Sequence, residues 1–164
     1  MLRIRPAERT DVPLILSLIR ELAEYERSPH AVRATEEDLL RDGFGPERRF
    51  HCAIAEWNGE AAGFALYFYN YSTWEGRPGI YLEDLYVRPS FRKRGIGRFF
   101  FTYLAQIALA ENLSRIQWQV LDWNQSAIDF YESLGAKKPA DWQTMRLSEE
   151  AIERLAAAKH SAPM

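Results

Sequence analysis

The sequence predicts an α/β protein, of the mixed α+β kind, in which one mixed β-sheet carries helices on both faces. Strand-like and helix-like apolar patterns follow one another in the order βααβββαβαβ, which favours helices packed against a common sheet. One strand, Tyr81–Val87, also runs through a glycine turn directly into a helix. The 164 residues contain no repeat, linker or low-complexity segment. We therefore expect a single domain spanning residues 1–164.

The first third of the chain predicts one strand and two helices. A short strand is expected over Leu2–Arg5, and Thr10-Asp11 offers an N-cap for the first helix. One apolar stripe then identifies an amphipathic helix: Val12, Ile15, Leu16, Ile19, Leu22 and Ala23. A capping box from Thr35 to Asp38 opens a second, short helix, and Gly43 is expected to end it.

The middle of the chain predicts a hairpin followed by the central strand. Strands are expected over residues 51–57 and 62–71, joined by Asn58-Gly59, a strong hairpin signal. Residues 72–79 are expected to form a loop before the strand Tyr81–Val87. Pro89 ends that strand because it cannot donate to a ladder.

The last third predicts three helices and two strands. A helix is expected from Gly95 to about Glu111, and a strand over residues 115–121. Asp122 or Asn124 is expected to cap the next helix, and Gly135 to end it. A last strand over residues 142–147 and a helix opening at Ser148 follow, with residues 160–164 expected to fray.

Composition excludes several classes of protein. Hydrophobic residues make up 47% and charged residues 27% of the chain, which are globular values. A net charge of −2 argues against a nucleic-acid partner. The single cysteine, Cys52, allows no intrachain disulfide, and the three histidines lack ligand spacing, so no metal site is expected. No signal sequence or membrane-length apolar run is visible, so we expect a soluble cytoplasmic protein with no membrane partner.

The turn after the central strand has the chemistry of a phosphate-binding loop. Gly95 and Gly97 allow close backbone approach, and the following helix offers free N–H groups and the positive end of its dipole. Basic side chains at Arg92, Lys93, Arg94 and Arg98 add charge for an anion with several phosphates. The spacing does not match either common nucleotide fingerprint.

This loop, Arg92-x-x-Gly95-x-Gly97 after Val87-x-Pro89, resembles the acetyl-CoA pyrophosphate loop of the GNAT N-acetyltransferases. Three further stretches resemble the diamine (spermidine/spermine-type) and thialysine acetyltransferases within that superfamily: Tyr71–Arg77, Tyr81–Val87, and Val120–Gln125 with its continuation to Phe130-Tyr131. The resemblance covers about Arg3 to Leu147.

The resemblance implies the GNAT fold, with the sheet splayed at its fourth strand, acetyl-CoA as cosubstrate, and a homodimer. It also implies the positions that hold the cosubstrate, which are Leu85, Tyr86, Val87, Arg92, Lys93, Arg94, Gly95, Ile96, Gly97, Arg98, Asn124 and Tyr131. Asn124 either contacts the cosubstrate or fixes the local backbone.

Amine acetylation needs a proton acceptor near the amine and a proton donor near the leaving sulfur. An alkylammonium has a pKa of about 10.4 and is not nucleophilic until it loses its proton. Glu83 and Asp84 are the candidate acceptors, although neighbours in a regular strand face opposite ways unless a bulge re-aims one of them. The resemblance implies Glu83 as the base, acting through water, with Asp84 beside the substrate amines.

The donor is implied by the resemblance alone. Helical spacing places Tyr131 on an apolar face, which indicates a core tyrosine. The match of Asn124-x-x-Ala127-x-x-Phe130-Tyr131-x-x-x-Gly135 to the family's second CoA motif implies instead that Tyr131 is the general acid.

Two further residues are candidates for the substrate side. Glu26 ends the acidic first helix and resembles an acidic substrate position of the diamine enzymes, although a solvated polar face explains it equally well. Trp74 offers a cation–π wall for the amine, or is a packed or interface tryptophan.

The resulting hypothesis is an acetyl-CoA-dependent N-acetyltransferase that acts on a primary amine of a small polyamine or of a thialysine- or lysine-like molecule. Attack is expected to be direct, in a ternary complex. The alternatives are acetylation of a protein N-terminus or lysine, and a non-catalytic acetyl-CoA-binding regulatory module.

Overall fold

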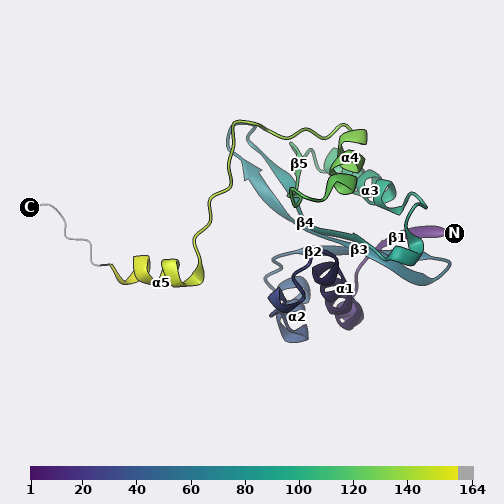
Figure 1. Ribbon diagram of the computed structural model, residues 1–164, viewed down its shortest axis with the longest axis horizontal. Helices are drawn as coiled ribbons and strands as arrows, with labels where there is room; N and C mark the ends of the chain where they lie inside the picture. Colours follow the sequence, from purple (N-terminus) through teal and green to yellow (C-terminus); the bar gives the residue numbers. More distant parts are fainter. Residues whose placement is uncertain (159–164) are drawn as a thin grey trace, which may run out of the picture. The chain divides into compact units, whose positions relative to one another are not determined.

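The computed structural model describes residues 1–158, and these form two compact units, residues 1–128 and the residues from Asp129 onward (Figure 1). Its strands and helices, in chain order, are β1 (Leu2–Pro6), α1 (Val12–Tyr25), α2 (Glu36–Phe44), β2 (His51–Trp57), β3 (Glu60–Ser72), β4 (Arg77–Val87), α3 (Ile96–Ala110), β5 (Ile116–Gln117), α4 (Gln125–Ser133) and α5 (Glu149–Ala157).

The first unit is built on one mixed sheet, as the sequence predicts. Its strands lie in the order β1-β2-β3-β4-β5; the first four pair antiparallel, and β5 pairs parallel with β4. The Asn58-Gly59 hairpin is confirmed, with Asn58 and Gly59 both at positive φ (51° and 83°). The next turn is tighter than expected, because β3 runs to Ser72 and β4 begins at Arg77.

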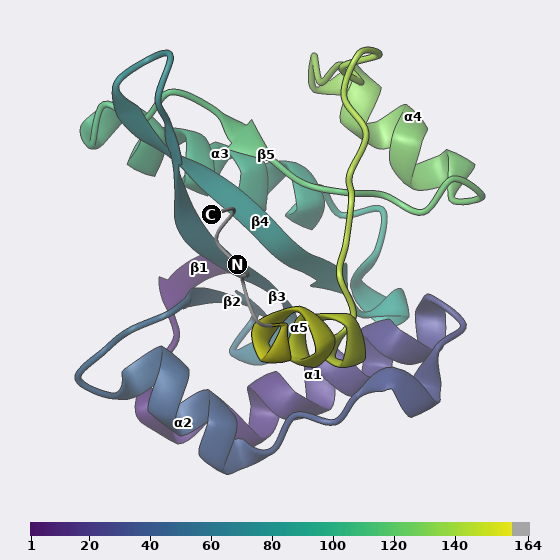
Figure 2. The same ribbon diagram turned by 90° about the vertical axis from the view of Figure 1, so that its left-hand side faces the viewer.

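Helices cover both faces of this sheet (Figures 1 and 2). On one face α1 and α2 bury Ile54, Phe64 and Leu66, while on the other α3 buries the alternate residues of the same strands. This two-residue alternation is what a sheet covered on both sides requires. The second face packs its small residues Ala53, Ala55 and Ala65 under Phe100 and Leu104 of α3.

A charged clamp fixes α1 against the end of β4. The Arg88 guanidinium donates from Nε and Nη2 to the Glu21 carboxylate, at 2.8 Å for the shortest pair, and from Nη1 to the Ala61 carbonyl at 3.0 Å. Because α1 leads into the turn that carries Glu26, this clamp sets the distance between that turn and β4.

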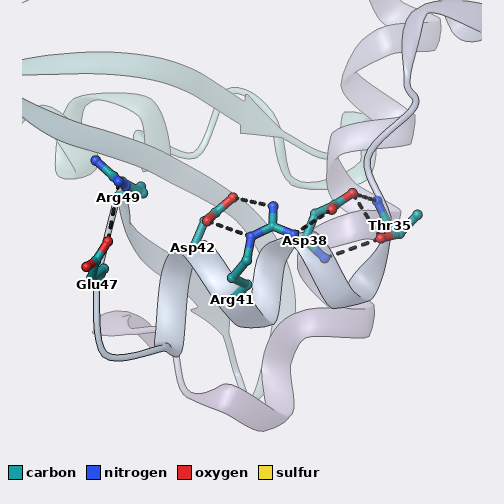
Figure 3. A network of polar contacts seen from close by, with 6 residues as sticks. All are labelled: Thr35, Asp38, Arg41, Asp42, Glu47 and Arg49. Atoms are coloured by element: carbon teal, nitrogen blue, oxygen red, sulfur yellow. Dashed lines mark hydrogen bonds and ion pairs between the residues drawn. The ribbon is translucent and has the colours of Figure 1, made fainter.

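The capping box predicted for α2 is present. Thr35 Oγ1 accepts from the Asp38 N–H at 3.2 Å, while the Asp38 carboxylate accepts from the Thr35 N–H at 2.9 Å (Figure 3). The predicted end at Gly43 is wrong, since α2 runs to Phe44 and the Gly45 N–H closes its last turn on the Arg41 carbonyl. Gly43 is required for packing instead, because a Cβ there would lie 2.5 Å from the Phe50 ring.

Two strand predictions need correction. The strand predicted over residues 115–121 is reduced to Ile116–Gln117, because β4 and β5 pair only at Ile80–Ile116 and Tyr81–Gln117 and then separate. Residues 142–147 form no strand among the described residues, because a strand needs a partner ladder and the second unit has only helical elements in its described part. The predicted helix opening is confirmed, since the Ser148 hydroxyl caps α5. The predicted frayed tail at residues 160–164 falls outside the described part of the chain.

Candidate active site

The site is organised around a bulge in β4. Leu66 of β3 faces Asp84 and the next residue, Tyr67, faces Leu82, so Glu83 is an extra residue in the ladder. A bulge breaks the strict alternation of side chains and bends its strand. The side chains of Glu83 and Asp84 therefore need not point to opposite faces of the sheet. Glu83 is exposed, while Asp84 is half-buried.

Glu26, Glu83 and Asp84 form an acid cluster. Glu26 and Asp84 are half-buried, and the charge of Glu83 helps to raise the pKa of both. Glu26 directly follows the C-terminal end of α1. Burial raises its pKa, and the nearby Glu83 charge adds to the effect. Burial raises the pKa of Asp84 to about 7, with smaller contributions from the charges of Glu83 and Glu26. A carboxyl with a pKa near neutrality, set by burial and by like charges, is typical of an acid–base site.

The sheet opens beside this cluster. Past Tyr81, β4 has no ladder with β5 in the described chain, although Leu85, Tyr86 and Val87 stay paired with β3. Backbone groups on the β5 side of these three residues are consequently available to a ligand. This opening is the splay that the resemblance implies at the fourth strand.

A phosphate cradle follows directly. Gly95, at φ 79°, precedes α3 without a side-chain cap, so the first-turn N–H groups at Ile96, Gly97 and Arg98 point outward. A Cβ at Gly95 would meet nothing within 4 Å, so the glycine is present for its backbone conformation. Uncapped N–H groups at a helix start bind anions, and the resemblance implies that this loop holds the phosphates of the cosubstrate.

The basic side chains of the loop differ in their contacts. Arg92 donates from Nε to the Val87 carbonyl at 3.0 Å, and its guanidinium lies 4.8 Å from the ring centroid of Tyr25. Arg94 donates to the Ser90 carbonyl and lies 4.9 Å from the centroid of Trp57. Arg92 thus lies beside the opened end of β4, while Arg94 is held on Trp57; Lys93 and Arg98 are exposed.

Charge reversal at this loop should weaken cosubstrate binding. We expect Arg92→Glu to raise the Kd for acetyl-CoA by about tenfold or more, because it places an anion where the resemblance implies a cation that holds the phosphates. Isothermal titration measures the change, and Arg49→Glu, on the surface after α2, is the control. An unchanged Kd for the Arg92 variant would assign the phosphates to another part of the molecule.

Asn124 has the local role that the sequence left open, because its Oδ1 accepts from the Ala127 N–H at 3.4 Å at the start of α4. The same oxygen accepts from the Tyr25 hydroxyl at 3.3 Å. Tyr25 also lies near Trp123, whose ring carries the Arg27 guanidinium at 3.9 Å from its centroid. The end of α1 is thereby tied to the segment before α4.

Sequence reasoning missed Tyr25, Arg27 and Trp123, whose rings and guanidinium group join the end of α1 to the segment before α4. No periodicity connects them, since about a hundred positions separate the end of α1 from the segment before α4. The one available signal is that Tyr25 and Arg27 flank the candidate Glu26 in the sequence.

Two further predicted residues, Trp74 and Tyr131, belong to elements other than those of the acid cluster. Trp74 is 89% exposed in the turn between β3 and β4. Tyr131 belongs to the second unit, on α4, where its carbonyl accepts from the N–H groups of Leu134 and Ala136. The roles implied for both side chains stay predictions.

Within residues 1–158, no group of three or more His, Cys, Asp and Glu side chains is placed to hold a metal ion. In the same part of the chain no helix has the length and apolar character that a membrane span requires. Burial raises the pKa of the Cys52 thiol well above its usual range, so this cysteine is an inert core residue.

Comparison with known proteins agrees with this arrangement. The model of the Acetyltransferase (GNAT) family matches residues 14–136. The thialysine N-epsilon-acetyltransferase of Bos taurus is 43% identical over 164 residues, covering 93% of this chain and 96% of that protein. The human spermidine/spermine N(1)-acetyltransferase-like protein 1 is 39% identical over 160 residues, covering 92% of this chain and 23% of that protein. An integron cassette protein from the mobile metagenome of V. cholerae has the same fold, with a TM-score of 0.81, 25% identity and coverage of 96% of this chain and 98% of that one.

Proposed function

This chain belongs to the GNAT family of acetyltransferases and is an N-acetyltransferase, and we propose that it transfers acetyl from acetyl-CoA to a primary amine of a small cation. The preferred substrate class is a thialysine- or lysine-like molecule, with small polyamines next. The acid cluster Glu26, Glu83 and Asp84 carries this proposal. Relatives named for thialysine and for spermidine/spermine acetylation support the same class.

The acid cluster suits a substrate that arrives positively charged. Burial and mutual repulsion make three neighbouring carboxylates costly while no cation is present, which is why the pKa values of Glu26 and Asp84 are raised. A bound ammonium relieves that repulsion and returns the carboxyls toward their ionised forms. The same negative field would repel an acidic substrate.

Deprotonation of the ammonium is the step that the cluster performs. We assign Glu83 as the acceptor through water, as the resemblance implies, and Asp84 as the partner that holds or releases a proton near pH 7. Because the charge of Glu83 contributes to the raised pKa of Asp84, the two carboxyls act as one coupled acceptor. No protein nucleophile is needed, since the freed amine attacks directly.

The cosubstrate supplies the electrophile, a thioester carbonyl. Uncapped N–H groups of Ile96, Gly97 and Arg98, together with Arg92 and Lys93, would hold its phosphates. The opened edge at Leu85–Val87 would receive its arm, where backbone N–H groups orient the acetyl carbonyl. Arg94, which is held on Trp57, is expected to contribute less than Arg92.

Tyr131 is proposed as the donor to the departing thiolate. We expect Tyr131→Phe to lower kcat by about a hundredfold or more while the Kd for acetyl-CoA stays unchanged, because only the hydroxyl is removed. Single-turnover kinetics and equilibrium titration separate the two quantities. Phe130→Leu, at the neighbouring ring, controls for lost packing. Full turnover in the Tyr131 variant would assign the proton donor elsewhere.

The experiment that tests the function is CoA release from acetyl-CoA in the presence of thialysine, lysine, spermidine, putrescine or a short peptide. Saturable release with thialysine or a diamine is expected. Saturable release with the peptide alone would favour protein acetylation. Tight acetyl-CoA binding without release on any amine would favour the non-catalytic regulatory module.

A homodimer is also proposed, on one observation in each unit. The end of β3 and the turn after it expose Tyr71 and Trp74, and the segment before α5 exposes Trp142, Met145 and Leu147. Such apolar surface is typical of association sites. Light scattering after gel filtration should give twice the mass of the chain, and Trp142→Glu combined with Met145→Glu should give the mass of one chain. A monomeric wild type would reject the proposal.

A further inference from the structure

A cavity lined by residues other than the acid cluster lies inside the first unit. It has a volume of about 250 Å³ and is partly open to solvent. Its lining includes charged and aromatic side chains of Arg48, His51, Tyr67, Tyr69, Tyr103 and Glu111. Tyr67 and Tyr69 face Leu82 and Ile80 of β4, on the opposite side of the Glu83 bulge from Leu85–Val87. The lining of the cavity includes none of the acid cluster and none of Leu85–Val87.

Aromatic rings form one wall of the cavity. His51 of β2 stacks on Tyr67, with ring centroids 5.5 Å apart, and meets the edge of Tyr69 at 5.3 Å. Tyr67 and Tyr69 lie edge to face at 6.3 Å. Burial raises the pKa of the Tyr67 and Tyr69 hydroxyls, to about 12 for Tyr69, so both remain neutral near pH 7. The wall thus offers ring faces together with neutral hydroxyl groups.

Charges of opposite sign border this wall. Glu111, at the C-terminal end of α3, lies close enough to Tyr69 to help raise the pKa of its hydroxyl, after burial. Arg48 Nη1 lies 3.4 Å from His51 Nδ1. Both charges act on the His51 ring. Burial lowers the His51 pKa most, the Arg48 charge lowers it further, and the Glu111 charge raises it. The lining of one small cavity thus includes an anion, a cation and several aromatic rings.

We propose that this cavity binds a small zwitterion, a free α- or ω-amino acid. The ammonium would lie against the tyrosine faces and Glu111, where cation–π attraction and a charge-assisted hydrogen bond act together. The carboxylate would pair with the Arg48 guanidinium. A cavity of about 250 Å³ has room for a ligand of a few heavy atoms. This inference does not rest on the proposed acetyl transfer.

The test is calorimetric titration without acetyl-CoA at pH 7, using γ-aminobutyrate and its two single-charge analogues, butylamine and butyrate. Because both charged ends are recognised, the zwitterion should bind about tenfold tighter than either analogue. Glu111→Gln should weaken γ-aminobutyrate about tenfold and leave butyrate unchanged, while Arg48→Gln should weaken γ-aminobutyrate and leave butylamine unchanged. Glycine, β-alanine and ε-aminohexanoate extend the series in length.

Matched variants locate the ligand. Glu47→Gln and Arg49→Gln change the neighbouring exposed ion pair, which does not line the cavity, and should leave binding intact. Asp84→Asn should also leave it intact, and thermal melting confirms that each variant is folded. The proposal is overturned if γ-aminobutyrate does not bind, if the controls weaken it as much as Arg48→Gln, or if Asp84→Asn abolishes binding, which would place the ligand in the acid cluster.

Discussion

Asp84→Asn should lower kcat/KM for the amine by about a hundred- to ten-thousandfold, the range over which a positioned acid–base group contributes. It should also remove the acid limb of the pH–rate profile. With a pKa raised to about 7, Asp84 gains its negative charge as the pH rises through neutrality. In the wild type kcat/KM should therefore rise across this range and level off above it.

Glu83→Gln provides the matched comparison. This change removes the assigned acceptor and should also lower kcat/KM. Because it takes away one cause of the raised Asp84 pKa, the acid limb of the residual rate should move to lower pH rather than disappear. Steady-state rates from pH 5 to 9 distinguish the two variants. A limb near pH 7 that survives in Asp84→Asn and is lost in Glu83→Gln would make Glu83 alone the titrating base.

The same carboxyl makes a stability prediction with a defined sign. Its pKa in the folded protein lies above the ordinary value of 3.8, so the folded state favours the protonated form. Stability is therefore lost as the pH rises from about 4 to about 7, because the buried group must ionise. Asp84→Asn should accordingly raise Tm at pH 8 and have little effect at pH 4. A lower Tm at pH 8 would contradict the stated cause of the shift.

Much of the first unit could be predicted from sequence because its signals are local. The Asn58-Gly59 turn, the capping box at Thr35 and the change from strand to helical spacing after Gly95 each depend on a few neighbouring residues. The separation of β4 from β5 could not be predicted in this way. Residues 116–121 keep a strand-like pattern, and the ladder stops because the neighbouring strand turns away.

In the candidate site, too, local sequence signals could be predicted and contacts between distant segments could not. The candidate phosphate loop is contiguous, so the sequence alone could propose its glycines and Arg92, whereas the position of Arg94 depends on Trp57 from a distant strand. Glu83 and Asp84 were identified, but the bulge that frees them was visible only in the register with β3. Tyr25 and Trp123 escaped prediction because they meet through the fold alone.

Gly63→Ala should be the most damaging single-methyl change in the sheet. A Cβ at Gly63 would lie 2.2 Å from the Tyr86 carbonyl oxygen and 3.1 Å from the Val87 Cα. Both atoms are backbone, so no side chain can move aside and β3 must separate from β4. Overpacking of this kind costs up to about 3 kcal/mol, or roughly 10 °C in Tm for a chain of this length.

The separation would occur where the phosphate loop begins. Gly63 faces Val87, the Arg88 N–H donates to the Ala62 carbonyl at 2.8 Å, and the Val87 carbonyl holds Arg92. Weaker acetyl-CoA binding should therefore accompany the loss of stability. Gly59→Ala is the control, because its φ is 83° but a Cβ there meets nothing within 4 Å. That change costs about 1 kcal/mol from backbone conformation alone, with acetyl-CoA binding unaffected. Equal losses of Tm in the two variants, or normal acetyl-CoA affinity in a destabilised Gly63→Ala protein, would show that close contact between β3 and β4 does not position the loop.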